Sequence, residues 1–201
     1  MKKKWAFTAA AGVLGGLFLA GVLEVGSSTG WFGLEELASP GVPSWEHSYE
    51  TTWDPSQDGV EGLSIRWAVG PVSVMPGEGP LITVTEYASR PLEEGERLAL
   101  SSSGGVLEVG WNGSLLPLGA LQDLEKRVEV KVPPELLSQL EELSCWNISG
   151  EVSVSGAFAQ ELSLGSLAGD LFLTGVSGEK AAVSTVSGDI QWSQGQAREL
   201  S

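Results

Sequence analysis

The stretch that decides the fold runs from Leu143 to Glu199, and it divides into three lines of nineteen residues without a gap. The lines are LSCWNISGEVSVSGAFAQE (143–161), LSLGSLAGDLFLTGVSGEK (162–180) and AAVSTVSGDIQWSQGQARE (181–199). Position eight is glycine in every copy and position nine is acidic, which gives the pairs Gly150-Glu151, Gly169-Asp170 and Gly188-Asp189. A fixed period near twenty residues is typical of a solenoid, in which each repeat buries its apolar face only against its neighbours.

The alternation of apolar residues within each line predicts the kind of solenoid. Positions six, eight, ten and twelve share one phase, as Leu167, Gly169, Leu171 and Leu173 show in the second copy. The apolar positions one and three have the opposite phase, so we expect two strand segments joined by a bend. Apolar residues do not recur at helical spacing, which excludes helix. The sequence therefore predicts an all-β fold with a β-solenoid of 19-residue coils.

The acids at position nine have two interpretations. Stacked coils lie about 4.8 Å apart, so Glu151, Asp170 and Asp189 could form a ladder of carboxylates that binds a hard cation such as calcium. Alternatively, glycine supplies a positive φ at the corner and the acid is the polar partner of a tight turn. Calcium-binding repeats bring several oxygen ligands per turn, whereas this repeat brings one. We favour the turn and predict no metal site.

Cysteine and histidine usage excludes several other kinds of site. The chain has one Cys and one His, so neither a disulfide framework nor a Cys/His metal site can be built. Cys145 is at repeat position three, where the other copies have Leu164 and Val183, which indicates a small buried hydrophobe. His47 lies in a polar stretch without a nucleophile pattern nearby. We predict no catalytic residue and no cofactor.

The N-terminus predicts a membrane anchor. Lys2–Lys4 precede nineteen uncharged residues, Trp5–Leu23, which as a helix would span roughly 28 Å, close to the hydrocarbon thickness of a bilayer. Cleavage as a signal peptide is the alternative, because a small-x-small site occurs at Gly26–Ser28, but the apolar core is longer than such peptides usually have. We expect residues 1–25 to form a single-pass anchor in the cell membrane, with the lysines in the cytoplasm and the C-terminal domain extracytoplasmic.

Charge restricts the partners. The net charge of the whole chain is −15. Without the three N-terminal lysines, 8 basic residues stand against 26 acidic ones, so the part predicted to be exported has a net charge of −18. Such a surface repels nucleic acid and anionic lipid headgroups. We expect no nucleic-acid partner and no small-molecule substrate. The expected partners are the membrane itself and an envelope component or membrane protein.

Residues 26–60 are predicted to be a linker, because Gly, Ser and Pro punctuate them and no period persists. Several aromatic residues are unusual in a pure tether. They either lie at the outer membrane interface, where Trp is favoured, or pack back on the domain. These residues are Trp31, Phe32, Trp45 and Trp53.

A strand-rich part follows the linker and completes the predicted domain, residues 61–201. Alternation begins at Leu63, breaks at Gly70-Pro71 and resumes, and further short strands extend to about residue 132. Residues 114–127 are expected to form a loop. The segment ELLSQLEEL (135–143) has leucines at helical spacing and predicts one or two helical turns or the entry into the first coil.

Several segments in this order resemble the DUF4097 family, adhesin-like β-strand-repeat proteins of the bacterial envelope. The segments are LSIRWAVGPVSV (63–74), KVP (131–133), NISGEVSVSG (147–156) and TVSGDIQW (185–192). The resemblance covers about residues 60–201 and implies an extracytoplasmic β-solenoid, with no catalytic residues to carry over. The chain stops at Leu200-Ser201, the first two positions of a fourth repeat, whereas solenoids normally close with a polar cap. We therefore expect the sequence to be a C-terminally truncated fragment.

Two classes of function fit these observations. The favoured one is a non-enzymatic, membrane-anchored module that binds or scaffolds in the cell envelope, with sensing of envelope stress beside a membrane protein as a variant. The other is a β-helix enzyme acting on polysaccharides, which needs two carboxylates about 5–10 Å apart. No second acidic column accompanies position nine, since position nineteen has Glu161, Lys180 and Glu199. We therefore predict that the protein is not an enzyme.

Overall fold

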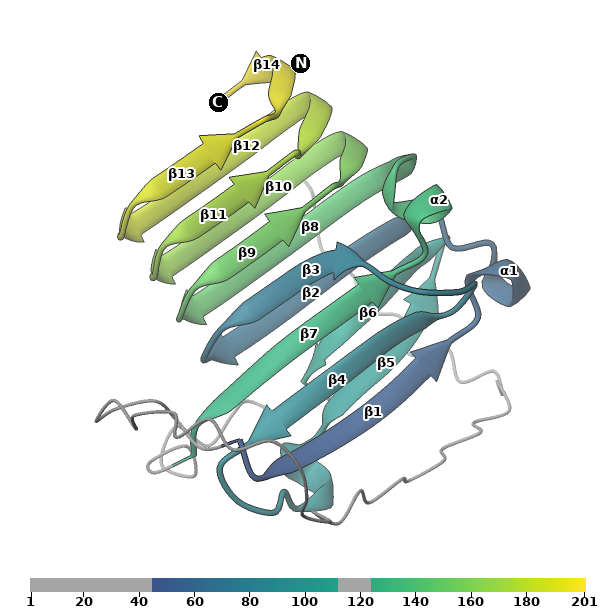
Figure 1. Cartoon of the computed structure of the whole chain (residues 1–201), viewed down its shortest axis with the longest axis vertical. Helices are drawn as coiled ribbons and strands as arrows, with labels where there is room; N and C mark the ends of the chain where they lie inside the picture. The colour runs from purple at the N-terminus through teal and green to yellow at the C-terminus, as the bar shows by residue number, and fades with distance from the viewer. Residues whose placement is uncertain (1–44, 112–123) are drawn as a thin grey trace, which may run out of the picture.

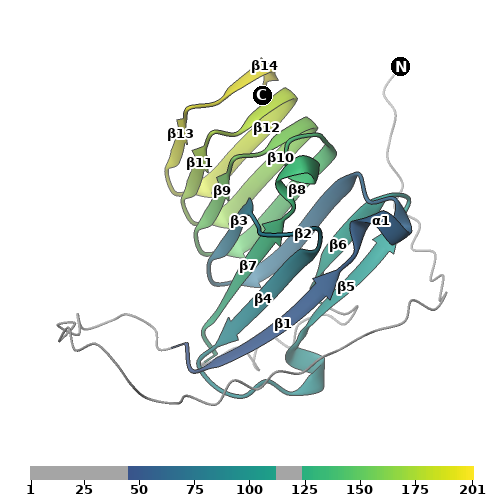
Figure 2. The ribbon, with the colours of Figure 1, turned by 45° about the vertical axis from the view of Figure 1, so that its right-hand side comes forward.

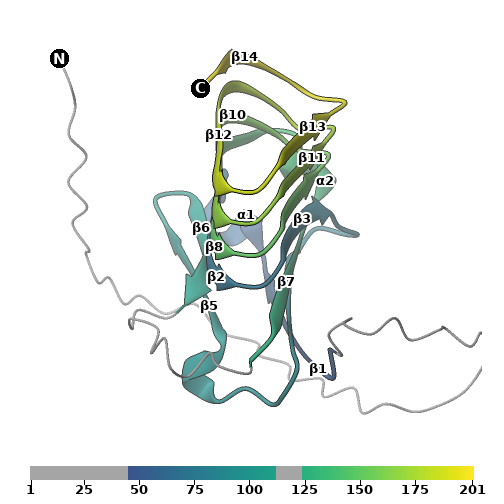
Figure 3. The ribbon, with the colours of Figure 1, turned by 90° about the vertical axis from the view of Figure 1, so that its left-hand side faces the viewer.

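The computed structural model describes residues 45–111 and 124–201, and over these residues the protein is all-β, as predicted. Two seven-stranded sheets face each other (Figures 1 and 3). The first sheet has the order β1-β4-β7-β3-β9-β11-β13, and the second has the order β14-β12-β10-β8-β2-β6-β5.

The first sheet consists of β1 (His47–Trp53), β4 (Ile82–Ala88), β7 (Lys126–Val132), β3 (Val72–Pro76), β9 (Val152–Ser155), β11 (Leu171–Thr174) and β13 (Ile190–Ser193). The second consists of β14 (Gln196–Leu200), β12 (Ser177–Ser187), β10 (Phe158–Ala168), β8 (Leu140–Ser149), β2 (Gly62–Val69), β6 (Val106–Trp111) and β5 (Leu98–Ser103). Three short helical turns connect them: α1 (Pro55–Asp58), a 3-10 turn (Glu94–Glu96) and α2 (Pro134–Leu137).

The 19-residue period of the sequence is the register of the parallel strands. In the second sheet, Leu162 of β10 pairs with Leu143 of β8 and with Ala181 of β12. In the first sheet, Leu171 of β11 pairs with Val152 of β9 and Ile190 of β13. Each repeat therefore gives one strand to each sheet and hydrogen-bonds only to the repeats before and after it (Figure 2).

A fourth copy of this two-strand unit precedes the three repeats. β2 and β3 pair with β8 and β9 in one continuous register, Leu63 with Leu143 and Val72 with Val152. This aligns LSIRWAVGPVSV with LSCWNISGEVSV and places Gly70-Pro71 at the corner glycine and acid. The offset of these pairs is 80 residues, which is not a multiple of nineteen, because β4 to β7 are inserted before the next repeat begins.

The bend lies later in the repeat than the sequence pattern indicated. Positions one and three are buried and position five also points inward, so position six faces outward: Ile148 is 44 % exposed, Leu167 47 % and Val186 75 %. The corner at position eight then shifts the phase. Positions ten and twelve consequently return to the core in the first two copies, as Leu171 and Leu173 show, whereas Ile190 of the last copy is exposed.

Cys145 is fully buried among apolar side chains, as predicted, and burial raises the pKa of its thiol to about 12.

The linker prediction for residues 26–60 is wrong where the structure describes strand and helix. β1 pairs antiparallel with β4 along its whole length, from His47 with Ala88 to Trp53 with Ile82. Its sequence, HSYETTW, has no aliphatic residue; every second residue is partly buried, and of these Trp53 packs against the core. Asp54 then caps α1 by accepting a hydrogen bond from the Ser56 amide at 3.0 Å.

The predicted anchor, Trp5–Leu23, lies outside the described residues, as do Trp31 and Phe32. Within the two described ranges, no helix has the length and apolar character needed to cross a membrane. The segment at 135–143 contains both predicted features, since the helical turn α2 ends at Leu137 and β8 begins at Leu140.

Corner glycines stack directly on one another through the parallel part of the fold. A Cβ on Gly150 would lie 2.4 Å from the carbonyl oxygen of Gly70, one on Gly169 would lie 2.0 Å from that of Gly150, and one on Gly188 would lie 2.4 Å from that of Gly169. These positions are closed to any side chain because the obstacle is backbone. Asn147 Nδ2 reinforces the corner by donating to the carbonyls of Gly70 and Gly150 at 3.0 and 3.1 Å.

We expect Gly169→Ala to lower the free energy of unfolding by about 3 kcal/mol or more. Overpacking typically costs about 1–3 kcal/mol, and here the added Cβ meets a backbone carbonyl that cannot rotate away. Gly95→Ala is the control, because a Cβ there meets nothing within 4 Å. Urea unfolding of both variants measures the difference. Equal stability of the two variants would show that the corner stacking is not a constraint.

Candidate functional site

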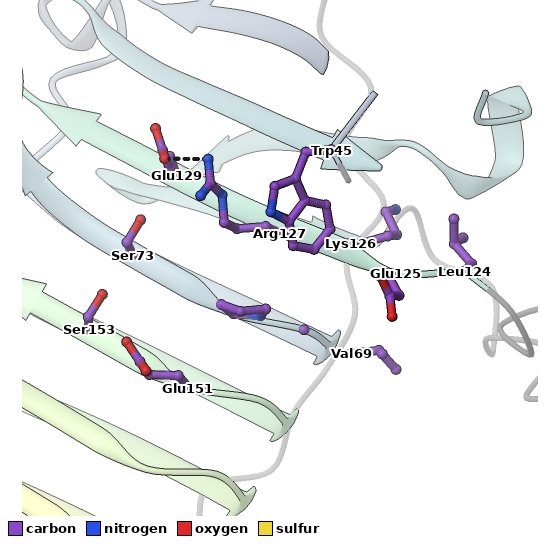
Figure 4. A pocket seen from close by; sticks show the side chains of 12 residues that line it. Trp45, Val69, Ser73, Leu124, Glu125, Lys126, Arg127, Glu129, Glu151 and Ser153 are labelled. Carbon is purple, nitrogen blue, oxygen red and sulfur yellow. Dashed lines mark ion pairs between the residues drawn. The ribbon is translucent and has the colours of Figure 1, made fainter. Parts of the chain in front are cut away.

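A pocket of about 560 Å³ lies on the outer face of the first sheet, where β7, β3 and β9 are side by side (Figure 4). Its volume is within the range usual for small-ligand sites. Its lining consists of Trp45, Val69, Gly70, Pro71, Ser73, Leu124, Glu125, Lys126, Arg127, Glu129, Glu151 and Ser153.

Strand alternation explains why polar side chains line this face. In β7, Val128, Val130 and Val132 point into the core, so Arg127 and Glu129 point outward. In the neighbouring strands, Val72 and Val74 of β3 and Val152 and Val154 of β9 are buried. The residues between them, Ser73 and Ser153, are consequently outward and form the hydroxyl-bearing floor of the pocket.

Arg127 is held by aromatic rings and a carboxylate. Its guanidinium lies 4.3 Å from the ring centre of Tyr87 and 5.7 Å from that of Trp45, within cation–π range. Its Nη2 pairs with Glu129 Oε1 at 2.9 Å, and Tyr87 Oη donates to Glu129 Oε2 at 3.3 Å. Lys131 Nζ is 3.8 Å from the same carboxylate. These contacts fix Arg127 and neutralise Glu129 before any ligand arrives.

Two other carboxylates at the pocket are exposed and, unlike Glu129, are not neutralised by a neighbouring cation of the described chain. Glu151 begins the corner of the first repeat and Glu125 precedes β7, and both are exposed. Neither takes part in an ion pair found within residues 45–111 and 124–201. The pocket therefore combines an aromatic wall, a hydroxyl-bearing floor and two carboxylates whose charge is not paired.

A buried ion pair lies behind the pocket. The side chain of Lys126 is 0 % exposed and that of its partner Glu86 is 3 % exposed. Lys126 Nζ also donates to the carbonyl of Glu96 at 2.6 Å and lies 4.9 Å from the ring centre of Trp67. Glu86 Oε2 accepts from the amide of Leu98 at 3.1 Å. Burial lowers the pKa of Lys126, and the Glu86 carboxylate opposes that shift.

A second ion pair continues this cluster towards the surface. Arg90 donates two hydrogen bonds to the Glu96 carboxylate, at 2.7 and 2.8 Å, and holds the pKa of Glu96 at about 2. Because Lys126 binds the backbone of the same residue, the turn at Glu94–Glu96 is tied to the start of β7.

The structure stacks the three acids that the sequence grouped, one in each layer, because Glu151, Asp170 and Asp189 directly precede the paired residues of β9, β11 and β13. Their side chains nevertheless make different contacts. Glu151 lines the pocket, whereas Asp170 Oδ1 accepts a hydrogen bond from the backbone amide of Asp189 at 2.8 Å. That bond joins one corner to the next, nineteen residues on, so Asp170 is a polar partner of the stacked corners but not of its own turn. No group of three His, Cys, Asp or Glu side chains with metal-binding geometry occurs in the part of the chain that the structure describes. His47 lies in β1 and is not among the residues that line the pocket.

Sequence reasoning missed the pocket. Lys126 and Arg127 fall in the predicted loop at 114–127 but begin β7, and Trp45 falls in the predicted linker. The alternation of basic residues with Val128 and Val130 is the signal that could have extended the strand backwards. No sequence signal placed Trp45 beside Arg127, since these residues meet only through β1 and β4.

We expect calcium to leave the melting temperature unchanged beyond the effect of sodium at equal ionic strength. Under the cation interpretation, a site filled at 100 times its Kd would add about 2.7 kcal/mol, a rise of roughly 3–5 °C. Thermal unfolding with millimolar calcium measures this. A calcium-specific rise of that size, abolished by Asp170→Asn, would replace the corner interpretation with a metal site.

Lys126→Met and Glu86→Leu should each lower the free energy of unfolding by about 3–5 kcal/mol, because each leaves one charge buried without its partner. The double variant should lose less than either single one, and urea unfolding of all three gives the coupling. Arg198→Met is the control, since its pair with Glu179 is exposed, and we expect no resolvable change. Additive losses at Lys126 and Glu86 would contradict the coupling.

Comparison with known proteins finds no match among curated proteins. Among the solved structures that are similar to the chain are three that each cover 77 % of it. One is a "putative cell adhesion protein" from Clostridium sporogenes ATCC 15579, with 12 % identity, a TM-score of 0.44 and 98 % of that chain covered. The others are each described as a "putative adhesin": one from Parabacteroides merdae ATCC 43184 (11 %, 0.33, 95 % covered) and one from Parabacteroides distasonis ATCC 8503 (12 %, 0.32, 76 % covered).

The family model Toastrack DUF4097 matches residues 73–201. The matched range contains the three 19-residue repeats and all of the inserted strands β4 to β7, so the resemblance seen in the repeat motifs is confirmed. It spans well over half of the sequence, and the protein therefore belongs to the Toastrack DUF4097 family.

Proposed function

We propose that the protein is a non-catalytic binding or scaffolding module of the bacterial cell envelope, built as a β-solenoid and tethered to the membrane by its N-terminal apolar segment. The parallel register of β8, β10 and β12 and of β9, β11 and β13 supports the solenoid. The cluster Lys2–Lys4 and the apolar stretch Trp5–Leu23 support the anchor and the extracytoplasmic orientation. An exported part of charge −18 suits a soluble surface that does not adhere to anionic lipid.

The composition of the pocket is the observation that carries this proposal. Its arginine is fixed by two aromatic rings and by Glu129, and its hydroxyls belong to serines on rigid strands. Such preorganised side chains favour recognition. Nucleophilic catalysis would need a base beside a serine, and the single histidine of the sequence is not in the pocket lining.

A polysaccharide-active enzyme is the alternative that the pocket argues against. Glycoside hydrolysis needs one carboxyl that is protonated and one that is ionised. The oxygens of Glu129 are already engaged by Arg127, Lys131 and Tyr87 Oη. The other two carboxylates of the lining, Glu125 and Glu151, are exposed. The described lining therefore lacks the apolar enclosure in which the general acid of such an enzyme is found.

Protease added to intact, wall-stripped cells should degrade the domain and spare cytoplasmic control proteins, because the lysines hold the N-terminus inside. Immunoblotting against the C-terminal repeats measures this. Complete protection would contradict the orientation, and a soluble form that starts near Thr29 would contradict the anchor.

Binding without turnover can be tested on isolated cell walls with the full chain in detergent. The protein should sediment with the walls or with a membrane partner and release no soluble reducing sugar over hours. Sugar release that persists in a Trp45→Leu variant would place an enzymatic site elsewhere. Release that this variant abolishes would make the pocket catalytic.

A further inference from the structure

The pocket carries more negative charge than its own cations neutralise. Lys126 is paired with Glu86, which lies on the core side of the sheet and outside the pocket lining. Arg127 is paired with Glu129 inside the pocket. Lys131, outside the lining, also lies 3.8 Å from the Glu129 carboxylate. The unpaired carboxylates Glu125 and Glu151 therefore leave the cavity and its surroundings with an excess of one negative charge. A ligand that enters it gains most if it is positively charged.

The aromatic wall favours a cation of a particular kind. The Trp45 ring already lies 5.7 Å from the guanidinium of Arg127, so its position allows contact with a cationic group. Indole is the best of the aromatic rings for contacts with ammonium and guanidinium groups. A divalent metal would instead need several oxygen ligands converging within about 2.6 Å.

The floor supplies acceptors for an N–H donor. Ser73 Oγ donates to the carbonyl of Val128 at 3.4 Å, which leaves the lone pairs of this hydroxyl available to accept a hydrogen bond. Ser153 occupies the same row one strand further along, and Glu151 lies two residues before it, directly after the corner glycine. Hydroxyl, carboxylate and ring face together match the three donors of a lysine ammonium or the fork of an arginine.

We propose that this pocket binds the basic side chain, lysine or arginine, of a polypeptide partner. The inference rests on the binding function proposed above and names its ligand class. Anionic ligands are disfavoured by the charge of the cavity and by the −15 of the chain. A neutral sugar would stack on Trp45 but would leave the two carboxylate charges without an electrostatic role.

The test measures binding of a short labelled peptide, acetyl-Gly-Gly-Lys-Gly-Gly-amide, to the full chain in detergent, by thermophoresis at low salt. Its ε-N-acetylated form is the neutral counterpart. We expect saturable binding of the charged peptide only, weakened by added salt. Glu151→Gln should raise the Kd about tenfold, the usual effect of losing one charge-assisted hydrogen bond. Trp45→Leu should raise it about fivefold through the lost ring contact.

Asp189→Asn is the matched control. It removes the same charge from the same repeat position, two strands away from Glu151 and outside the pocket lining. We expect its Kd to stay within about twofold of the unaltered chain. Equal weakening by Glu151→Gln and Asp189→Asn would reduce the effect to general charge attraction and overturn the inference. Equal binding of the acetylated peptide would overturn it as well.

A third arm uses N-acetylglucosamine as the neutral-sugar probe. Binding of this sugar that Trp45→Leu abolishes, without binding of the lysine peptide, would overturn the ligand class but leave the binding function standing. If neither probe binds, the basic side chain is the wrong ligand. The protease and cell-wall experiments decide separately whether the proposed function survives.

Discussion

The stacking of the corner glycines is the constraint on which the rest of the structure depends. Gly70, Gly150, Gly169 and Gly188 approach the carbonyl of the preceding layer so closely that none could carry a Cβ without overlap. Because the chain reverses direction across this narrow corner, each repeat can place one strand in each sheet. Asn147 and Thr185 donate to the corner carbonyls from within the core, so the backbone groups left by the turn are satisfied there.

This corner also determines which side chains are available for function. The phase of the alternation shifts at the glycine, so the aliphatic residues before it, Ile148, Leu167 and Val186, lie on the surface of the second sheet. The residues after it put valine or leucine inside on the first sheet, and in β3 and β9 the residue between the two valines is an outward serine. The hydroxyl-bearing floor of the pocket is thus a consequence of the same turn that sets the register of the core.

The inserted strands β4 to β7 turn a plain stack into a structure with a pocket. They add antiparallel pairs beside β3, and β7 presents Arg127 and Glu129 next to the serine row. The buried pair of Lys126 and Glu86 fixes the start of β7 against β4. A hydrophobic pair could stabilise the core equally well. The charged pair additionally positions the backbone from which Arg127 projects, and it links β7 to the turn at Glu96.

The repeat, its 19-residue period, the all-β class and the family could be predicted from the amino acids alone, because the glycine-acid step recurs at each corner and the side chains alternate with the pleat. The burial of Cys145 could be predicted as well, since the same position is aliphatic in the other copies. That Leu63 and Val72 belong to the same stack as Leu143 and Val152 could be seen only in the folded chain, because an inserted set of strands breaks the period. The pocket likewise required the fold. Trp45, Arg127 and Glu151 are far apart in the chain, and parallel pairing with antiparallel insertion brings them to one face.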